Sequence, residues 1–185
     1  WLPRPESVEL VKHVLQPAVR YTRDECFDIG NTVYDALTSY LDSIKYNQFV
    51  HPYRGRVDEE TSGNGALMRM APVIIVSRDR DEAIRLAMQQ TLLTHASQLC
   101  VQYSIMFAEE LYAGNPISKY SQFKLPDNIR REDVMSGGFV KETYEAAWWA
   151  FSSSSSFEEC VIKAVNRGKD ADTTGAVAGM IAGRF

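Results

Sequence analysis

The chain has 185 residues, of which 45% are hydrophobic, 24% charged and 11% aromatic, and its formal net charge is -4. The hydrophobic fraction is too high for a disordered chain, and no apolar run approaches the roughly 20 residues of a membrane-spanning helix. Because 24 acidic residues outnumber 20 basic ones, binding to a nucleic-acid backbone by bulk charge is excluded as well. Length and composition predict a single folded domain over residues 1–185 and leave its chemistry open.

Hydrophobic residues recur with the period of an α-helix through most of the chain, and the stretch 97–111 is apolar on nearly every side, as in a buried helix. Only 73–76 could be a strand, and pattern alone does not distinguish it from a buried helix. With no hairpin signal or internal repeat, the predicted fold class is all-α. Helices are expected over 11–21, 33–44, 81–94, 97–111, 139–151 and 157–166, the last ended by Gly168.

Three cysteines, Cys26, Cys100 and Cys160, lie far apart and form no Cys-x-x-Cys pair. Neither a zinc site nor a disulfide framework is supported, so we expect buried, reduced thiols. Together with the absence of a signal peptide at the start of this sequence, they predict a cytoplasmic protein.

The first candidate site is the segment Thr61-Ser62-Gly63-Asn64-Gly65. Its glycines let backbone amides approach an anion, and its hydroxyls add donors, so the loop could cradle a phosphate. It matches neither a P-loop nor a dinucleotide fingerprint, and a plain turn is the alternative. The loop 47–63 is expected at the surface, and the long loop 115–135 could be a lid or a connector.

His95 follows Thr94 near the end of a predicted helix. A lone histidine there is either a packed or capping residue or a group that contacts a ligand. His13 and His51 have no partner in the sequence, and no role is assigned to them.

Two carboxylates two residues apart, Asp170 and Asp172, precede Thr173 and Thr174 at the start of a predicted helix. Carboxylate and hydroxyl oxygens are the ligands that Mg²⁺ prefers, which favours a metal site. The alternative is helix capping by Asp172, Thr173 or Thr174, with the acids stabilised by the helix dipole.

The same helix carries a glycine every fourth residue, at Gly175, Gly179 and Gly183. Glycine destabilises a helix by roughly 1 kcal/mol relative to alanine, so a compensating gain is expected. We predict close packing of this face against a neighbouring helix.

Taken in order, four segments resemble the ADP-ribosylglycohydrolase family, the group that includes the dinitrogenase-reductase-activating glycohydrolases. The Gly-Asn-Gly run through Pro72 and the final Asp-x-Asp-Thr run are the most specific of them. The segments are Asp28-Ile29-Gly30-Asn31-Thr32, the run from Gly63 to Pro72, Thr94-His95, and the run from Asp170 to Gly179.

The resemblance implies an orthogonal multi-helix bundle that holds two divalent cations, Mg²⁺ or Mn²⁺, in a central cleft. It implies hydrolysis of the bond between ADP-ribose and a protein side chain or related acceptor, with an ADP-ribosylated protein or small ADP-ribose conjugate as partner. The cations would polarise ribose hydroxyls and position a water for attack on the anomeric carbon. The implied metal ligands are Asp170, Asp172 and Thr173, and the implied ADP-ribose-binding residues are Thr61, Ser62, Gly63, Asn64, Gly65 and His95.

The chain also departs from the family pattern, because the early Thr-Asp-Asp-Thr segment that supplies the other half of the metal site is missing. We therefore expect part of a larger domain, incomplete at both ends and active only if the missing segment is supplied. The alternative is a non-catalytic relative that binds ADP-ribose or another nucleotide, or has a structural role.

Overall fold

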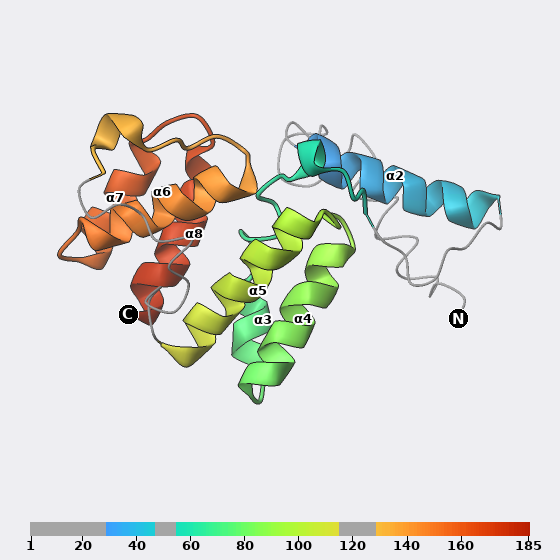
Figure 1. The fold of residues 1–185 in the computed structure, drawn as a ribbon, viewed down its shortest axis with the longest axis horizontal. Coiled ribbons are helices and arrows are strands. Elements are labelled where there is room, and N and C mark those ends of the chain that lie inside the picture. Colours follow the sequence, from blue (N-terminus) through green and yellow to red (C-terminus); the bar gives the residue numbers. More distant parts are fainter. Residues whose placement is uncertain (1–28, 47–54, 115–128) are drawn as a thin grey trace, which may run out of the picture.

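The computed structural model describes residues 29–46, 55–114 and 129–185, and within these ranges it is built from helices joined by turns (Figure 1). The all-α prediction is confirmed: the described residues contain no strand, only isolated β-bridges. The predicted helix over 11–21 lies outside them, as do His13, Cys26, Asp28 and His51. The helices are α2 (Asn31–Lys45), α3 (Ala71–Val76), α4 (Arg80–Leu92), α5 (Gln98–Ala113), α6 (Val140–Ser152), α7 (Phe157–Val165) and α8 (Ala171–Arg184), with 3-10 turns η1 (Glu59–Thr61) and η3 (Arg131–Asp133).

The candidate strand over 73–76 is wrong, because these residues form most of α3. Pro72 stands in the first turn, where its fixed φ favours a helix and its missing N–H costs nothing. The helix alternative is confirmed, but this helix is only partly buried: Val73 and Ile74 pack against the core, whereas Ile75 is 81% exposed.

Local signals explain where several helices begin and end. Asp79, Ser97 and Ser156 each accept a hydrogen bond from a backbone N–H in the first turn of α4, α5 and α7. Gly114 ends α5 with a φ of 66°, a conformation that favours glycine. By contrast, α2, α6 and α8 have no side-chain capping bond.

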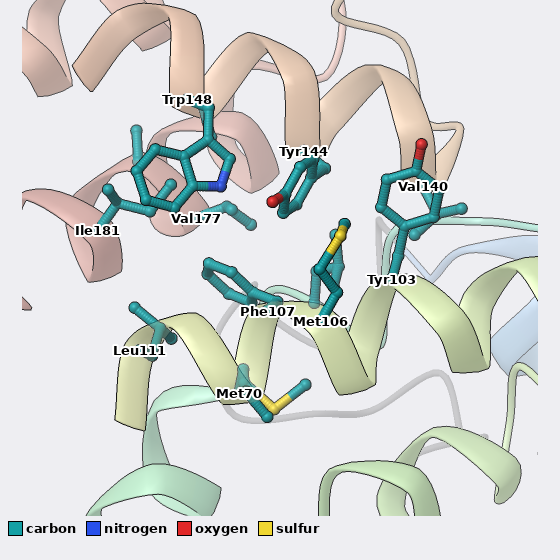
Figure 2. Close-up of a cluster of buried hydrophobic side chains, with 14 of the residues drawn as sticks. Met70, Tyr103, Met106, Phe107, Leu111, Val140, Tyr144, Trp148, Val177 and Ile181 are labelled. Atoms are coloured by element: carbon teal, nitrogen blue, oxygen red, sulfur yellow. The ribbon is translucent and has the colours of Figure 1, made fainter. Parts of the chain in front are cut away.

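The core forms where α5 packs against α6 and α8 (Figure 2). Tyr144 and Trp148 of α6 point towards α5 and α8, where Phe107 and Ile181 meet them, and all four are at most 1% exposed. The Tyr144 ring packs edge-on to those of Phe107 and Trp148. As predicted, α5 is largely buried, and it links the α3–α4 side of the molecule to the α6–α8 side.

The glycine face of α8 does not pack as predicted. The buried face of this helix consists of Thr173, Thr174, Val177, Ala178 and Ile181, and Gly175, Gly179 and Gly183 lie outside it. A Cβ on Gly175 would come within 2.9 Å of a Val165 methyl in α7, whereas one on Gly179 would meet nothing within 4 Å. Close packing is therefore restricted to the first of the three glycines.

Cys100 and Cys160 are free and buried, as predicted for both. Among the helices of the described ranges, none is long and apolar enough to cross a membrane.

Candidate active site

A cavity of about 550 Å³ opens where α2 and α8 begin, next to the loop that precedes α3. Of the residues singled out in the sequence, it brings together Gly63, Asn64, Gly65, His95 and the Asp170-x-Asp172-Thr173 segment. Residues 30 and 170 are more than a hundred positions apart, so the cavity is a product of the fold. Its lining is Ile29, Gly30, Asn31, Thr32, Val33, Gly63, Asn64, Gly65, Met68, His95, Gly138, Asp170, Asp172 and Thr173.

Thr61 and Ser62 are not among the lining residues. The Ser62 hydroxyl is buried against that of Ser97, at 2.8 Å, and the Ser62 carbonyl accepts a hydrogen bond from the Val140 N–H at 2.9 Å. The Thr61 hydroxyl donates to the Asp58 carbonyl, which closes η1. Ser62 thus anchors the loop to the starts of α5 and α6, and Thr61 stabilises the turn that precedes it.

Asn64 joins the loop to the acidic segment across 106 residues of sequence. Its side-chain amide donates to the Thr143 hydroxyl and to the Asp170 carboxylate, both at 2.7 Å. Its backbone N–H donates to the Gly138 carbonyl at 3.0 Å. Because Asn64 is only 7% exposed, this network places Asp170 firmly at the edge of the cavity.

Asp170 occupies the N-cap position of α8, and its side chain makes no capping bond. The predicted caps Asp172, Thr173 and Thr174 are wrong, since all three lie within the helix. Burial by itself would raise the pKa of Asp170, but hydrogen bonding, above all from Asn64, outweighs it, so this pKa lies below its ordinary value. The Asp170 carboxylate is therefore charged at neutral pH.

The donor set of this segment fits one hard cation better than two. Asp170, Asp172 and Thr173 line one wall of the cavity and offer two carboxylates and a hydroxyl. Mg²⁺ is commonly held by one or two carboxylates and keeps several waters, so such a set can serve one ion. Among the described residues, however, no group of three or more His, Cys, Asp or Glu lies close enough to share an ion.

His95 also lines the cavity and is 2% exposed. Its Nδ1 lies 2.7 Å from the Thr94 hydroxyl. The ring packs so closely on the loop that a Cβ on Gly63 would lie 3.2 Å from Nε2, and one on Gly65 3.0 Å from Cε1. A side chain at either position would crowd this ring, and the ring would have to shift to admit it.

Burial, together with the nearby positive charge of Arg69, lowers the pKa of His95 to about 4 from an ordinary value of 6.5. His95 is thus neutral at physiological pH. It can offer a cavity ligand a neutral donor or acceptor and carries no positive charge of its own.

This shift has a consequence for stability. The unfolded chain binds a proton at His95 below about pH 6.5, whereas the folded chain binds it only near pH 4. The contribution of this group to stability is therefore complete above about pH 6.5 and is lost as the pH falls towards 4. The free energy of unfolding is expected to fall by about 2 kcal/mol between about pH 7 and about pH 5 through this group. Urea unfolding of the native protein and of His95→Gln at both pH values measures the difference, and equal pH dependence of the two would contradict it.

Helix ends add to the electrostatics of the cavity. The first turns of α2 and α8 line it, α6 begins two residues after Gly138, and none of these helices has a side-chain cap. Free N–H groups and the positive end of the dipole at a helix N-terminus favour an anion. The two carboxylates at the start of α8, Asp170 and Asp172, outweigh the partial positive charge of that helix end, so this wall can hold a cation. The start of α2 has no acidic residue in its first turn and therefore favours phosphate oxygens.

Sequence reasoning assigned no role to several lining residues. Gly138 was missed although the pair Gly137-Gly138 directly precedes a predicted helix, which is a signal for close backbone approach. Met68 was recognised only as part of a longer run. Thr143, which holds Asn64 from the first turn of α6, has no feature in the sequence that marks it. The segment 29–32 before and at the start of α2 entered only through the family resemblance, and no chemical pattern in it predicts a place in the cavity wall.

Comparison with known proteins points to the same family that the sequence motifs resemble. A sequence model of the ADP-ribosylglycohydrolase family matches residues 6–114 and 113–185. The ADP-ribosylarginine hydrolases Tri1 of Serratia proteamaculans (strain 568) and Pseudomonas putida (strain GB-1) are 32% and 31% identical over 176 and 179 residues, in each case 85% of this chain and 46% of the relative. The ADP-ribosyl-[dinitrogen reductase] glycohydrolase of Rhodospirillum rubrum is 26% identical over 168 residues, 84% of this chain and 54% of that protein.

A solved structure described as an ADP-ribosylglycohydrolase-related protein complex superposes with a TM-score of 0.61 at 27% identity, over 84% of this chain and 58% of the other. The chain thus spans about half the length of the curated relatives it matches. From the family match over nearly its whole length, the chain belongs to the ADP-ribosylglycohydrolase family.

Proposed function

We propose that the protein containing this chain hydrolyses the bond between ADP-ribose and a modified protein side chain, with arginine as the first acceptor to test. The observation that carries the proposal is the cavity itself, which is lined by the Gly-Asn-Gly loop and His95 together with the Asp170-x-Asp172-Thr173 segment. The two hydrolases at about 31–32% identity, whose names specify ADP-ribosylarginine, support the choice of acceptor.

In this proposal the ADP-ribose lies against Gly63, Asn64, Gly65 and His95. The absence of side chains at 63 and 65 lets phosphate or ribose oxygens approach the backbone, and the first turn of α2 offers further N–H groups to the same cavity. Thr61 and Ser62 contribute indirectly, since their bonds to Asp58 and Ser97 hold the loop in place.

Asp170, Asp172 and Thr173 would hold Mg²⁺ or Mn²⁺ beside the ribose. When bound, the cation supplies Lewis-acid polarisation of ribose hydroxyls and a more acidic water. The residues of the chain do the positioning: Asn64 fixes one Asp170 oxygen at 2.7 Å, and the first turn of α8 presents Asp172 and Thr173 on the same wall. The neutral His95 orients the nucleotide without repelling a cation nearby.

A non-catalytic ADP-ribose-binding role is the second candidate. It is favoured by one observation: within the described ranges the acidic segment offers ligands for one cation, and no further acidic or histidine cluster supplies a second. In that case the loop and His95 would bind the nucleotide, and no bond would be broken.

A direct assay on the full-length protein distinguishes the hydrolase from the non-catalytic ADP-ribose-binding protein. A peptide ADP-ribosylated on arginine is incubated with the protein and Mg²⁺, with and without EDTA, and released ADP-ribose is quantified while its affinity is measured by calorimetry. Release that EDTA abolishes supports the hydrolase, and binding without release supports the second candidate. A protein that neither binds nor releases ADP-ribose would contradict both.

A further inference from the structure

Next to His95 lies a partly buried cation, Arg69, which has no acidic partner among the described residues. Arg69 donates through Nε to the Gln90 side-chain carbonyl at 2.6 Å, and through one terminal nitrogen to the Gln90 backbone carbonyl at 3.0 Å and the Thr94 hydroxyl at 2.6 Å. Gln90 is itself held by its amide, which donates to the Ala66 carbonyl at 3.1 Å. The arginine is thus placed by the helix behind it, with its charge directed at Thr94.

The Thr94 hydroxyl connects Arg69 to His95 by hydrogen bonds. A guanidinium has donors only, so the Thr94 hydroxyl must accept from Arg69. Its own proton then needs an acceptor, and the remaining partner that the structure gives this hydroxyl is His95 Nδ1, at 2.7 Å. If Nδ1 carried the proton instead, the hydroxyl of Thr94, which is 8% exposed, would hold a buried and unpaired hydrogen.

We infer that Arg69 is a positioning residue which, through the Thr94 hydroxyl, holds the neutral His95 ring in the tautomer that presents Nε2–H to the cavity. The inference deepens the proposed function, because it names the donor that this site offers to an oxygen of the bound ADP-ribose. His95 is neutral at physiological pH, as a fixed tautomer requires.

The surroundings of Nε2 agree with this assignment. Nε2 lies beside Gly63 and Gly65, where a Cβ would come within about 3.2–3.3 Å of it, and no hydrogen bond joins it to any residue in the described part of the chain. A donor at this position faces the cavity that Gly63, Gly65 and His95 line together. An Arg69 side chain that only filled space would leave the choice of tautomer open.

Nitrogen-15 NMR of histidine-labelled full-length protein reads the tautomer directly, with the His95 signals identified by their loss in His95→Gln. We expect a single Nε2–H form in the native protein and in Thr94→Ser, which keeps the hydroxyl. Thr94→Val keeps the shape and removes the hydroxyl, so a mixture of both tautomers is expected. Arg69→Met is expected to give a mixture too, whereas Arg85→Met, at an exposed arginine of α4, is expected to change nothing.

Affinity for free ADP-ribose provides the second measurement. Thr94→Val is expected to weaken binding about fivefold, the equivalent of one ordinary hydrogen bond, and Thr94→Ser to restore it. An Nδ1–H ring in the native protein, or an unchanged single tautomer in a folded Thr94→Val, would overturn the inference whether or not ADP-ribose binds. Failure to bind ADP-ribose alongside the expected tautomer pattern would instead count against the proposed function alone.

Discussion

Asp170→Asn is expected to lower the rate of ADP-ribose release about 100-fold or more, while the free energy of unfolding changes by less than about 1 kcal/mol. The asparagine carbonyl can still accept from Asn64, so the link of 2.7 Å between loop and helix is kept. What is removed is the negative charge that we propose a cation needs at this wall. Steady-state kinetics and urea unfolding of the same preparation separate the two effects.

The chain offers a matched control for this charge. Asp172 is the second residue of α8 and Asp81 the second residue of α4, so both stand in the same place relative to a helix dipole. Asp172→Asn is expected to reduce activity strongly, whereas Asp81→Asn, whose side chain is 93% exposed and far from the cavity lining, is expected to have no effect on it. Equal activities of the two variants would contradict a metal role for the Asp170-x-Asp172 segment.

Gly55→Ala is expected to destabilise the fold by about 3 kcal/mol. A Cβ at this position would lie 2.2 Å from the Thr94 carbonyl oxygen, a clash with backbone that no side-chain rotation can relieve. The parallel β-bridge between Arg56 and His95 would have to open. The hydrogen bonds from the Gly55 N–H to the Leu92 carbonyl and from the Ala96 N–H to the Arg56 carbonyl would be lost with it. The clash falls on Thr94, whose neighbour His95 lines the cavity, so the affinity for ADP-ribose is expected to fall as well.

Gly179→Ala is the contrasting substitution. This glycine has open space around its Cβ position and lies within a helix, so alanine is expected to leave stability unchanged or raise it by up to about 1 kcal/mol. Chemical denaturation of both variants provides the comparison. A Gly55→Ala protein as stable as Gly179→Ala would show that the segment around Gly55 adapts freely.

Helices were predictable where a periodic apolar face meets the core, as in α6 and α7, because burial and period agree there. The α3 segment was not, since a short run of β-branched residues satisfies helix and strand patterns alike, and Pro72 in the first turn decides between them. The glycine spacing of α8 was misleading for a related reason: period alone does not say which face of a helix meets its neighbours.

The site was predictable in its parts and not in its connections. The Gly-Asn-Gly loop, His95 and the Asp170-x-Asp172 pair each carry residue types whose chemistry can be recognised in isolation. That Asn64 binds Asp170, or that Arg69 reaches His95 through Thr94, depends on contacts between residues 25 to 106 positions apart. Such pairings are set by how the helices pack, and no local pattern encodes them.

The uncapped start of α2 makes this part of the cavity wall depend on the ligand that occupies it. A helix whose first N–H groups lack partners frays from that end, and a bound phosphate satisfies those groups as a side-chain cap would. Ligand binding is thus coupled to the completion of the first turn of α2, and the amide hydrogens of this turn should exchange fastest when the cavity is empty. A nucleotide that binds here would also shift the local folding equilibrium of this part of the wall towards the helical state.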